Sequence, residues 1–171
     1  MGKWIGAGMI LLGCAGLLYQ WYKTQKERQR LLMEWIRLLS GWEHSLLLEK
    51  IRLKEFLCRF DAREEAFRLF LENLVLAIEE RRYPFGQRIW NEVLFSCRKQ
   101  MPLTKEQWEI LHQASDAFFG VNCDEALRNT RRSIQGLKEA QSREQGEFLQ
   151  KQKVYMPVGM LGGILLIILF L

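Results

Sequence analysis

Residues 31–60, LLMEWIRLLSGWEHSLLLEKIRLKEFLCRF, decide the fold class. Large apolar side chains recur there at steps of three and four residues, with an interruption at Glu49. This spacing is typical of a helix with one apolar face. A helix of that length has an apolar stripe that must be covered, so the stretch predicts an all-α helical bundle. The stripe consists of Leu32, Trp35, Leu39, Trp42, Leu46, Leu53, Phe56 and Phe60.

The next segment predicts a second helix and its end. Asp61 and Glu64 have the spacing of a capping box variant, so we expect a helix to start near Ala62. Residues 81–85, RRYPF, interrupt the periodic pattern, and Pro84 makes continued helix unfavourable. The expected inward side chains of this helix are Phe67, Phe70, Leu74 and Ile78.

Three further helices are expected before the carboxy-terminal stretch. The third covers residues 86–99, and the fourth opens at Thr104 with Gln107 as its capping partner. Gly120 is expected to end the fourth helix as a left-handed cap, and Asp124 to begin a long fifth. There is no alternating strand pattern and no internal repeat. The expected inward residues are Ile89, Trp90, Val93 and Leu94 in the third helix and Trp108, Leu111, Ser115 and Phe118 in the fourth.

The charge of the chain lies almost entirely in its middle. Of 171 residues 26% are charged, yet residues 4–22 and 154–171 contain no Asp, Glu, Lys, Arg or His. As helices these stretches cover roughly 27 to 29 Å, which is close to the thickness of a bilayer's hydrocarbon core. They predict transmembrane helices at 4–22 and 154–171 around a cytoplasmic bundle at 23–153. A freely soluble protein is excluded on this interpretation.

Orientation follows from the residues beside the two predicted spans. A cleavable secretory signal is the alternative for the first stretch, because Lys3 precedes it and small residues follow. An uncleaved anchor is favoured, because the apolar run is longer than a usual signal core and ends in the interfacial pair Trp21 and Tyr22. Basic residues flank both spans on the side of the middle segment, which predicts a cytoplasmic bundle and external termini. They are Lys23, Lys26, Arg28, Arg30, Lys151 and Lys153.

Small residues within the predicted spans are candidates for helix packing. Gly6 and Gly13 share one stripe of the first span, and Gly159 with Gly163 forms a small-xxx-small pair in the second. Such patterns allow helices to approach closely in lipid. The packing is expected either between the two spans or with other membrane proteins. The alternative is that glycine is simply common in membrane helices.

Sequence motifs for chemistry are missing. There is no glycine-rich phosphate loop followed by Lys and Ser or Thr, so the chain has no nucleotide site of the usual kind. His44 and His112 have no metal-ligand spacing with the four cysteines, and no Cys-x-x-Cys pair occurs. We therefore expect no cofactor, no metal and no catalytic residue. Arg128, Arg131 and Arg132 are too few for nucleic-acid binding and suit acidic lipid or an acidic partner instead.

The carboxy-terminal stretch KVYMPVGMLGGILLIILFL and the segment LTKEQWEILHQASDAFFGVNCDEALRN resemble the stage III sporulation protein AB family. The resemblance covers nearly all of the chain. Trp90 also matches a tryptophan usual in the third helix, and Trp42 with Glu43 stands where the family has a leucine–glutamate pair. The family's tyrosine–glycine and threonine–proline break is absent near residue 50, which leaves that helix boundary open. The matching glycine and tyrosine pattern of the second span is Tyr155, Gly159, Gly162 and Gly163.

The resemblance implies a membrane protein of endospore-forming bacteria. Its bundle is similar to the cytoplasmic domain of the F component of type II secretion and type IV pilus machines, which implies an antiparallel helical bundle. The family belongs to a complex in the mother-cell membrane that faces the forespore, and its soluble part engages a cytosolic secretion-type ATPase. The expected function is therefore a non-enzymatic scaffold that contacts this ATPase, other membrane subunits and the lipid bilayer.

The contact face for a partner is predicted at the loop between the second and third helices. Arg81, Arg82, Tyr83 and Phe85 combine charge and aromatic surface in a connecting segment, where binding residues often lie. Two alternatives remain at this point. One is a membrane-anchored regulator or enzyme with a small pocket in the bundle, which would use His112 or Glu109; the other is a homo-oligomerising structural protein.

Overall fold

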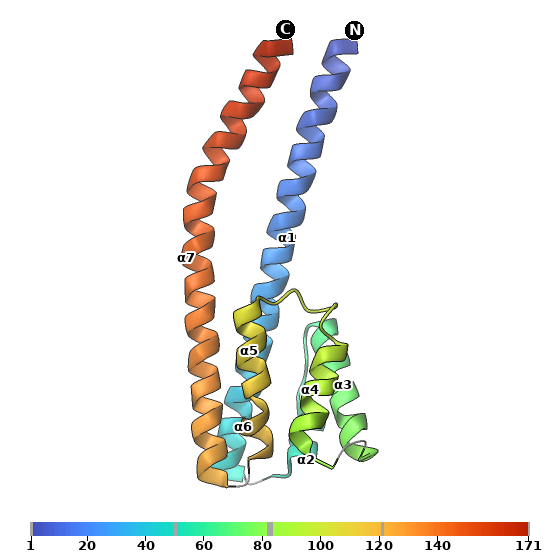
Figure 1. The fold of residues 1–171 in the computed structure, drawn as a ribbon, viewed down its shortest axis with the longest axis vertical. Helices are drawn as coiled ribbons and strands as arrows, with labels where there is room; N and C mark the ends of the chain where they lie inside the picture. Colours follow the sequence, from blue (N-terminus) through green and yellow to red (C-terminus); the bar gives the residue numbers. More distant parts are fainter. Residues whose placement is uncertain (1, 50, 82–83, 121, 171) are drawn as a thin grey trace. The chain divides into compact units, whose positions relative to one another are not determined.

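The computed structural model describes the backbone of residues 2–49, 51–81, 84–120 and 122–170. Side chains are described at residues 13, 16, 19–48, 51–81, 84–120, 122–148 and 150. Within these residues every regular element is helical, which confirms the all-α prediction (Figure 1). The elements are α1 (Gly2–His44), a π-helical segment η1 (Ser45–Glu49), α2 (Leu53–Arg59), α3 (Glu65–Glu79), α4 (Gly86–Ser96), α5 (Lys105–Gln113), α6 (Ser115–Phe119) and α7 (Cys123–Phe170).

The chain forms two compact units. One unit comprises residues 27–141 and contains the bundle, that is, the end of α1, helices α2 to α6 and the start of α7. The other comprises residues 1–26 and 142–171, which are the outer parts of α1 and α7. In the bundle unit α3 packs on α2 and α4, and α4 also packs on α5 and α6.

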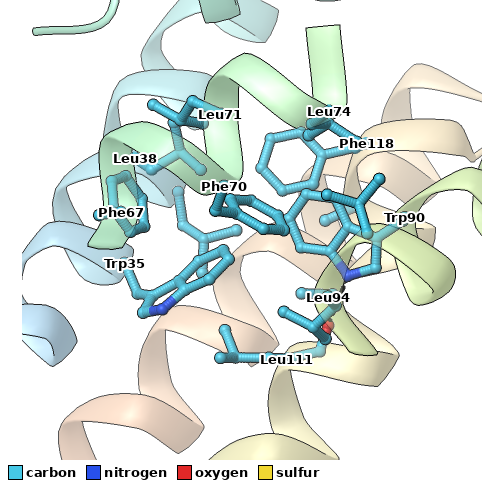
Figure 2. Close-up of a cluster of buried hydrophobic side chains, with 14 of the residues drawn as sticks. Trp35, Leu38, Phe67, Phe70, Leu71, Leu74, Trp90, Leu94, Leu111 and Phe118 are labelled. Atoms are coloured by element: carbon cyan, nitrogen blue, oxygen red, sulfur yellow. Dashed lines mark hydrogen bonds between the residues drawn. The ribbon is translucent and has the colours of Figure 1, made fainter. Parts of the chain in front are cut away.

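Aromatic side chains from four helices form the centre of the bundle. The Phe70 ring lies between Trp35 and Trp90, with ring centroids 4.9 and 5.3 Å away (Figure 2). Trp90 also stacks on Phe118 at 4.8 Å, and Trp35 meets Phe67 edge-on at 4.8 Å. All five rings are buried. Such pairs add about 0.5–1.5 kcal/mol each beyond the apolar area they bury, so this cluster holds α1, α3, α4 and α6 together.

The predicted inward faces agree with this core. Of the residues named for the second to fourth helices, Ile78 is half-buried and the others are buried. The helix boundary near residue 50 is also present despite the missing sequence break. It consists of η1, which ends at Glu49, and the non-helical residues 51 and 52 before α2. The turn allows α2 to lie close to α1, where a Cβ added to Gly41 would be 3.3 Å from the Phe56 ring.

The start of α3 differs from the prediction. Asp61 and Glu64 do not form a capping box: α3 begins at Glu65, and the side chain of its N-cap residue Glu64 makes no capping hydrogen bond. The connector before α3 is instead held by α1. Arg37 bonds the Asp61 carbonyl and lies 3.1 Å from the Glu34 carboxylate, which in turn lies 3.5 Å from the Arg63 backbone N–H.

The predicted capping box of α5 is confirmed. Thr104 Oγ1 accepts the Gln107 backbone N–H at 3.3 Å, and Gln107 Oε1 accepts the Thr104 backbone N–H at 2.9 Å. The expected single fourth helix, however, is interrupted at Ala114, and two helices result. Three side chains bond backbone carbonyls at this interruption or in the short helix that follows it.

Those side chains are two tryptophans and a serine. Trp90 Nε1 donates to the Leu111 carbonyl and Trp42 Nε1 to the Ala117 carbonyl, each at 2.8 Å and both buried. Ser115 Oγ donates to the His112 carbonyl at 2.9 Å. Carbonyls at a helix end lack intrahelical donors, and a buried one without any partner costs about 1–3 kcal/mol. The Trp90 indole therefore satisfies a carbonyl in the last turn of α5, and the Trp42 indole satisfies one in the last turn of α6.

Two glycines are required by close approach rather than by a left-handed backbone. Gly120 has φ −62° and ψ 146°, so the expected left-handed cap is wrong. A Cβ there would lie 2.7 Å from the Asp116 carbonyl oxygen. A Cβ at Gly86 would overlap the ring of Phe119. Gly136 in α7 differs, because the nearest side chain to its added Cβ would be at an ordinary contact distance of 3.4 Å.

Candidate functional site

The turn between α3 and α4 is exposed where the structure describes it. Arg81 is exposed and has φ 47°, the only described non-glycine residue with a positive φ. Its left-handed conformation ends α3, a position usually taken by Gly or Asn. Phe85, the N-cap residue of α4, is 69% exposed. Arg82 and Tyr83, which were predicted to share this contact, lie outside the described residues.

The exposed surface extends from Phe85 along the outer face of α4. Phe85, Arg88, Glu92 and Phe95 follow at spacings of three, four and three residues, which places them on one side of the helix. Phe95 is 65% exposed. An exposed phenylalanine therefore stands at each end of this helix face. We call these four residues the α4 face.

A hollow of about 690 Å³ lies along the α4 face. Its polar side includes His112 of α5, whose Nδ1 is 2.8 Å from Asn91 Oδ1. The hollow is lined by Phe85, Gln87, Arg88, Asn91, Glu92, Phe95 and His112. An apolar side chain at each end and charged groups between them suit a segment of protein chain better than a small apolar molecule.

The sequence predicted one end of this surface but not the other. Arg81 and Phe85 were predicted because they stand in a connecting loop. Phe95, which lies inside a helix, was not predicted. The available signal was the helical register: with Ile89, Trp90, Val93 and Leu94 directed inward, Phe95 falls on the outer side.

The residues considered for catalysis do not come together. His44 and Glu109 are exposed, and neither lines the hollow that contains His112. Among the described residues no group of His, Cys, Asp and Glu side chains could hold a metal ion. Of the arginines considered for nucleic acid or lipid, Arg131 pairs with Glu43 at 2.6 Å. Among the described residues, these side chains therefore form no shared site.

The predicted membrane spans fall mostly outside the described side chains. Gly6, Gly159 and Gly163 lie there, so their proposed packing is untested. Gly13 is described, and a Cβ added to it would meet no atom within 4 Å. Searched over its described residues alone, the structure has no helix with the length and apolar character needed to cross a membrane.

Comparison with known proteins identifies the family. The sequence profile of stage III sporulation protein AB matches residues 3–171, nearly the whole chain. The chain belongs to the stage III sporulation protein AB family. It is therefore a sporulation protein, and the predicted resemblance is confirmed.

A solved structure supports this at the level of the fold. The chain is similar to one titled "Stage III sporulation protein AB (SpoIIIAB)", with a TM-score of 0.60 over 71% of this chain and 97% of that one. The two sequences are 13% identical, so the likeness concerns the helical fold alone. The chain matches no curated protein.

Proposed function

We propose that the chain is a non-enzymatic scaffold subunit of a sporulation transport or channel complex that recruits a secretion-type ATPase to a membrane. The observation that carries this proposal is the family match over residues 3–171, joined to an all-α bundle between two uncharged ends. By the family resemblance, the membrane is that of the mother cell around the forespore. The ATPase supplies the nucleotide chemistry for which the chain has no motif.

The proposal places residues 4–22 and 154–171 in the bilayer, with the bundle in the cytoplasm. The basic residues beside both stretches support this orientation. A reporter fused to either terminus tests it. Activity only on the outer side of the membrane is the expected result, and activity in the cytoplasm would contradict the topology.

The α4 face supports a role in protein contact. Phe85 and Phe95 stand ten residues apart, which along a helix is about 15 Å. Burying one exposed phenylalanine contributes about 1.5–3 kcal/mol. Arg88 and Glu92 between them can fix the register of a partner, because mispaired charges at an interface are costly. Aromatic side chains are enriched at protein interfaces, which supports Phe85 and Phe95 as apolar anchors.

A retention assay on the full-length chain tests the function. The chain is solubilised in mild detergent with the ATPase encoded beside it, immobilised, and washed at moderate salt. We expect the ATPase to be retained. No retention in several detergents and salt concentrations would contradict the proposal.

Two alanine variants then test the surface. Phe85→Ala is expected to weaken retention at least several-fold. Leu76→Ala is the matched control, because Leu76 is an apolar residue of α3 that is 49% exposed and does not line the hollow. Equal retention of the ATPase by both variants would show that the α4 face is not its binding surface, and it would not contradict the scaffold role. Native mass of the same sample separates a monomer from the homo-oligomer alternative.

A further inference from the structure

The unit formed by residues 1–26 and 142–171 contains a described contact between its two helices. The Trp21 ring of α1 stacks on the Phe148 ring of α7, with centroids 5.1 Å apart and planes 18° apart. Tyr22 meets the same ring at 6.5 Å. At the depth of Phe148, the side of α1 that carries Trp21 and Tyr22 therefore faces α7.

Helix geometry carries this direction outward along α1. Each residue turns the helix by about 100°, so position 14 lies about 30° from the mean direction of Trp21 and Tyr22, and position 7 about 10°. Position 13 lies about 130° away and position 16 about 170° away. The described glycines agree, since a Cβ added to Gly13 or Gly16 would meet nothing within 4 Å. Gly13 and Gly16 are thus turned away from the direction of Trp21 and Tyr22.

The same arithmetic on α7 gives matching positions. Positions 155 and 162 lie about 20° and 40° from Phe148 in direction, at about 10 and 21 Å along the axis. On α1, positions 14 and 7 are about 10 and 21 Å from Trp21. Both helices are continuous through these residues. Ideal helix geometry would therefore place the members of each pair at one depth and on the facing sides of the two helices.

We propose that α1 and α7 form an antiparallel membrane hairpin whose contact continues outward from Trp21 and Phe148 through two further levels. Cys14 faces Tyr155 at the first level, and Ala7 faces Gly162 at the second. The helix that packs on this face of α1 is thus the second span of the same chain, in α7. Ala7 and Gly162 are small enough for close approach of the helices. The inference rests on the membrane placement of residues 4–22 and 154–171 in the proposed function.

Disulfide formation in the full-length chain in native membranes tests the first level. Tyr155→Cys is combined with the natural Cys14, and the membranes are treated with copper phenanthroline. The matched control carries Gly13→Cys and Cys14→Ser with the same Tyr155→Cys, so that one thiol moves by one residue and turns away. A disulfide needs Cα atoms about 4.4–6.8 Å apart. The background for all variants lacks the other three cysteines, Cys58, Cys97 and Cys123.

The second level is tested separately, because Pro157 lies between the two levels and a proline can bend a helix. Ala7→Cys with Gly162→Cys is compared with Gly6→Cys with Gly162→Cys, both in the background with Cys14→Ser. Protection from a thiol-reactive polymer measures disulfide formation. We expect the facing pair at each level to form a disulfide within one chain several-fold faster than its control.

Other outcomes overturn the hairpin. Equal or faster reaction of the controls places α7 on another face of α1. Disulfides mainly between chains show that a second copy occupies the face, and the absence of disulfides at both levels shows that the spans lie apart. Carbonate extraction of the same membranes separates the two proposals. A chain that is extracted refutes the membrane placement, whereas a chain that stays in the membrane without the disulfides refutes the hairpin alone.

Discussion

Trp90 and Trp35 allow the hydrogen bond at the interruption between α5 and α6 to be measured. Both side chains are fully buried and belong to one aromatic cluster (Figure 2). The Trp90 indole N–H donates to the Leu111 carbonyl at 2.8 Å, whereas that of Trp35 has no hydrogen-bond partner among the described residues. Trp90→Phe and Trp35→Phe remove the same atoms, but only the first removes a hydrogen bond.

The expected difference follows from this contrast. The apolar loss and the cavity are of the same kind for both substitutions, so they largely cancel. Trp90→Phe also leaves the buried Leu111 carbonyl without its donor, which costs about 1–3 kcal/mol. Trp35→Phe removes a buried donor that was already unsatisfied. We therefore expect Trp90→Phe to lower the free energy of unfolding by about 1–3 kcal/mol more than Trp35→Phe.

The assay is thermal and urea unfolding of the full-length chain in detergent, followed by circular dichroism at 222 nm. Each kcal/mol corresponds to about 2–4 °C in Tm for a chain of this size. Trp90→Phe should therefore melt at the lower temperature, with an unchanged urea slope in both variants. Equal Tm values, or a larger loss for Trp35→Phe, would show that the Trp90 hydrogen bond contributes nothing to stability.

Three further predictions concern single residues of the bundle and are measured as Tm in the same detergent. Thr104→Ala removes the capping hydrogen bond of α5 and should cost about 1 kcal/mol, whereas Thr104→Ser should restore most of it. Gly86→Ala should destabilise by about 1–3 kcal/mol through overlap with a ring, whereas Gly136→Ala should stabilise by up to about 1 kcal/mol; the same sign for both would contradict the packing described. Lys54 Nζ donates a hydrogen bond to the Glu79 carboxylate at 2.8 Å, which raises the pKa of Lys54 above its ordinary 10.5. The pair therefore stabilises the fold below about pH 10.5, and this stabilisation is lost as the pH rises through the folded-state pKa of Lys54. Wild type should accordingly lose more Tm than Lys54→Met above about pH 10.5, and parallel curves would refute this.

The inward faces of the bundle were predictable because they depend on local periodicity. Trp90 and Leu94, for example, follow the helical spacing of α4 and are buried. The cap at Thr104 was predictable for a similar reason, since both partners lie within four residues. The start of α3 was not, because Asp61 and Glu64 have the right spacing but the connector is fixed by α1 instead.

In the candidate site, too, the residues in local sequence signals were predictable and the long-range contacts were not. Arg81 and Phe85 could be named from the break at Pro84 alone. The hollow along α4 could not, because His112 comes from a helix that follows α4 in sequence and reaches Asn91 only in the folded bundle. Residues 4–22 and 154–171 were defined by their lack of charge, and their membrane placement stays a prediction.

Two hydrogen bonds to α5 and α6 come from residues far away in the chain. Trp42 and Ala117 are 75 residues apart, and Trp90 and Leu111 are 21 apart. A peptide of residues 103–121 contains neither of these two donors. Both bonds therefore form only when α1 and α4 pack on α5 and α6. A spectroscopic probe of the Leu111 and Ala117 carbonyls would thus report on assembly of the bundle rather than on helix formation.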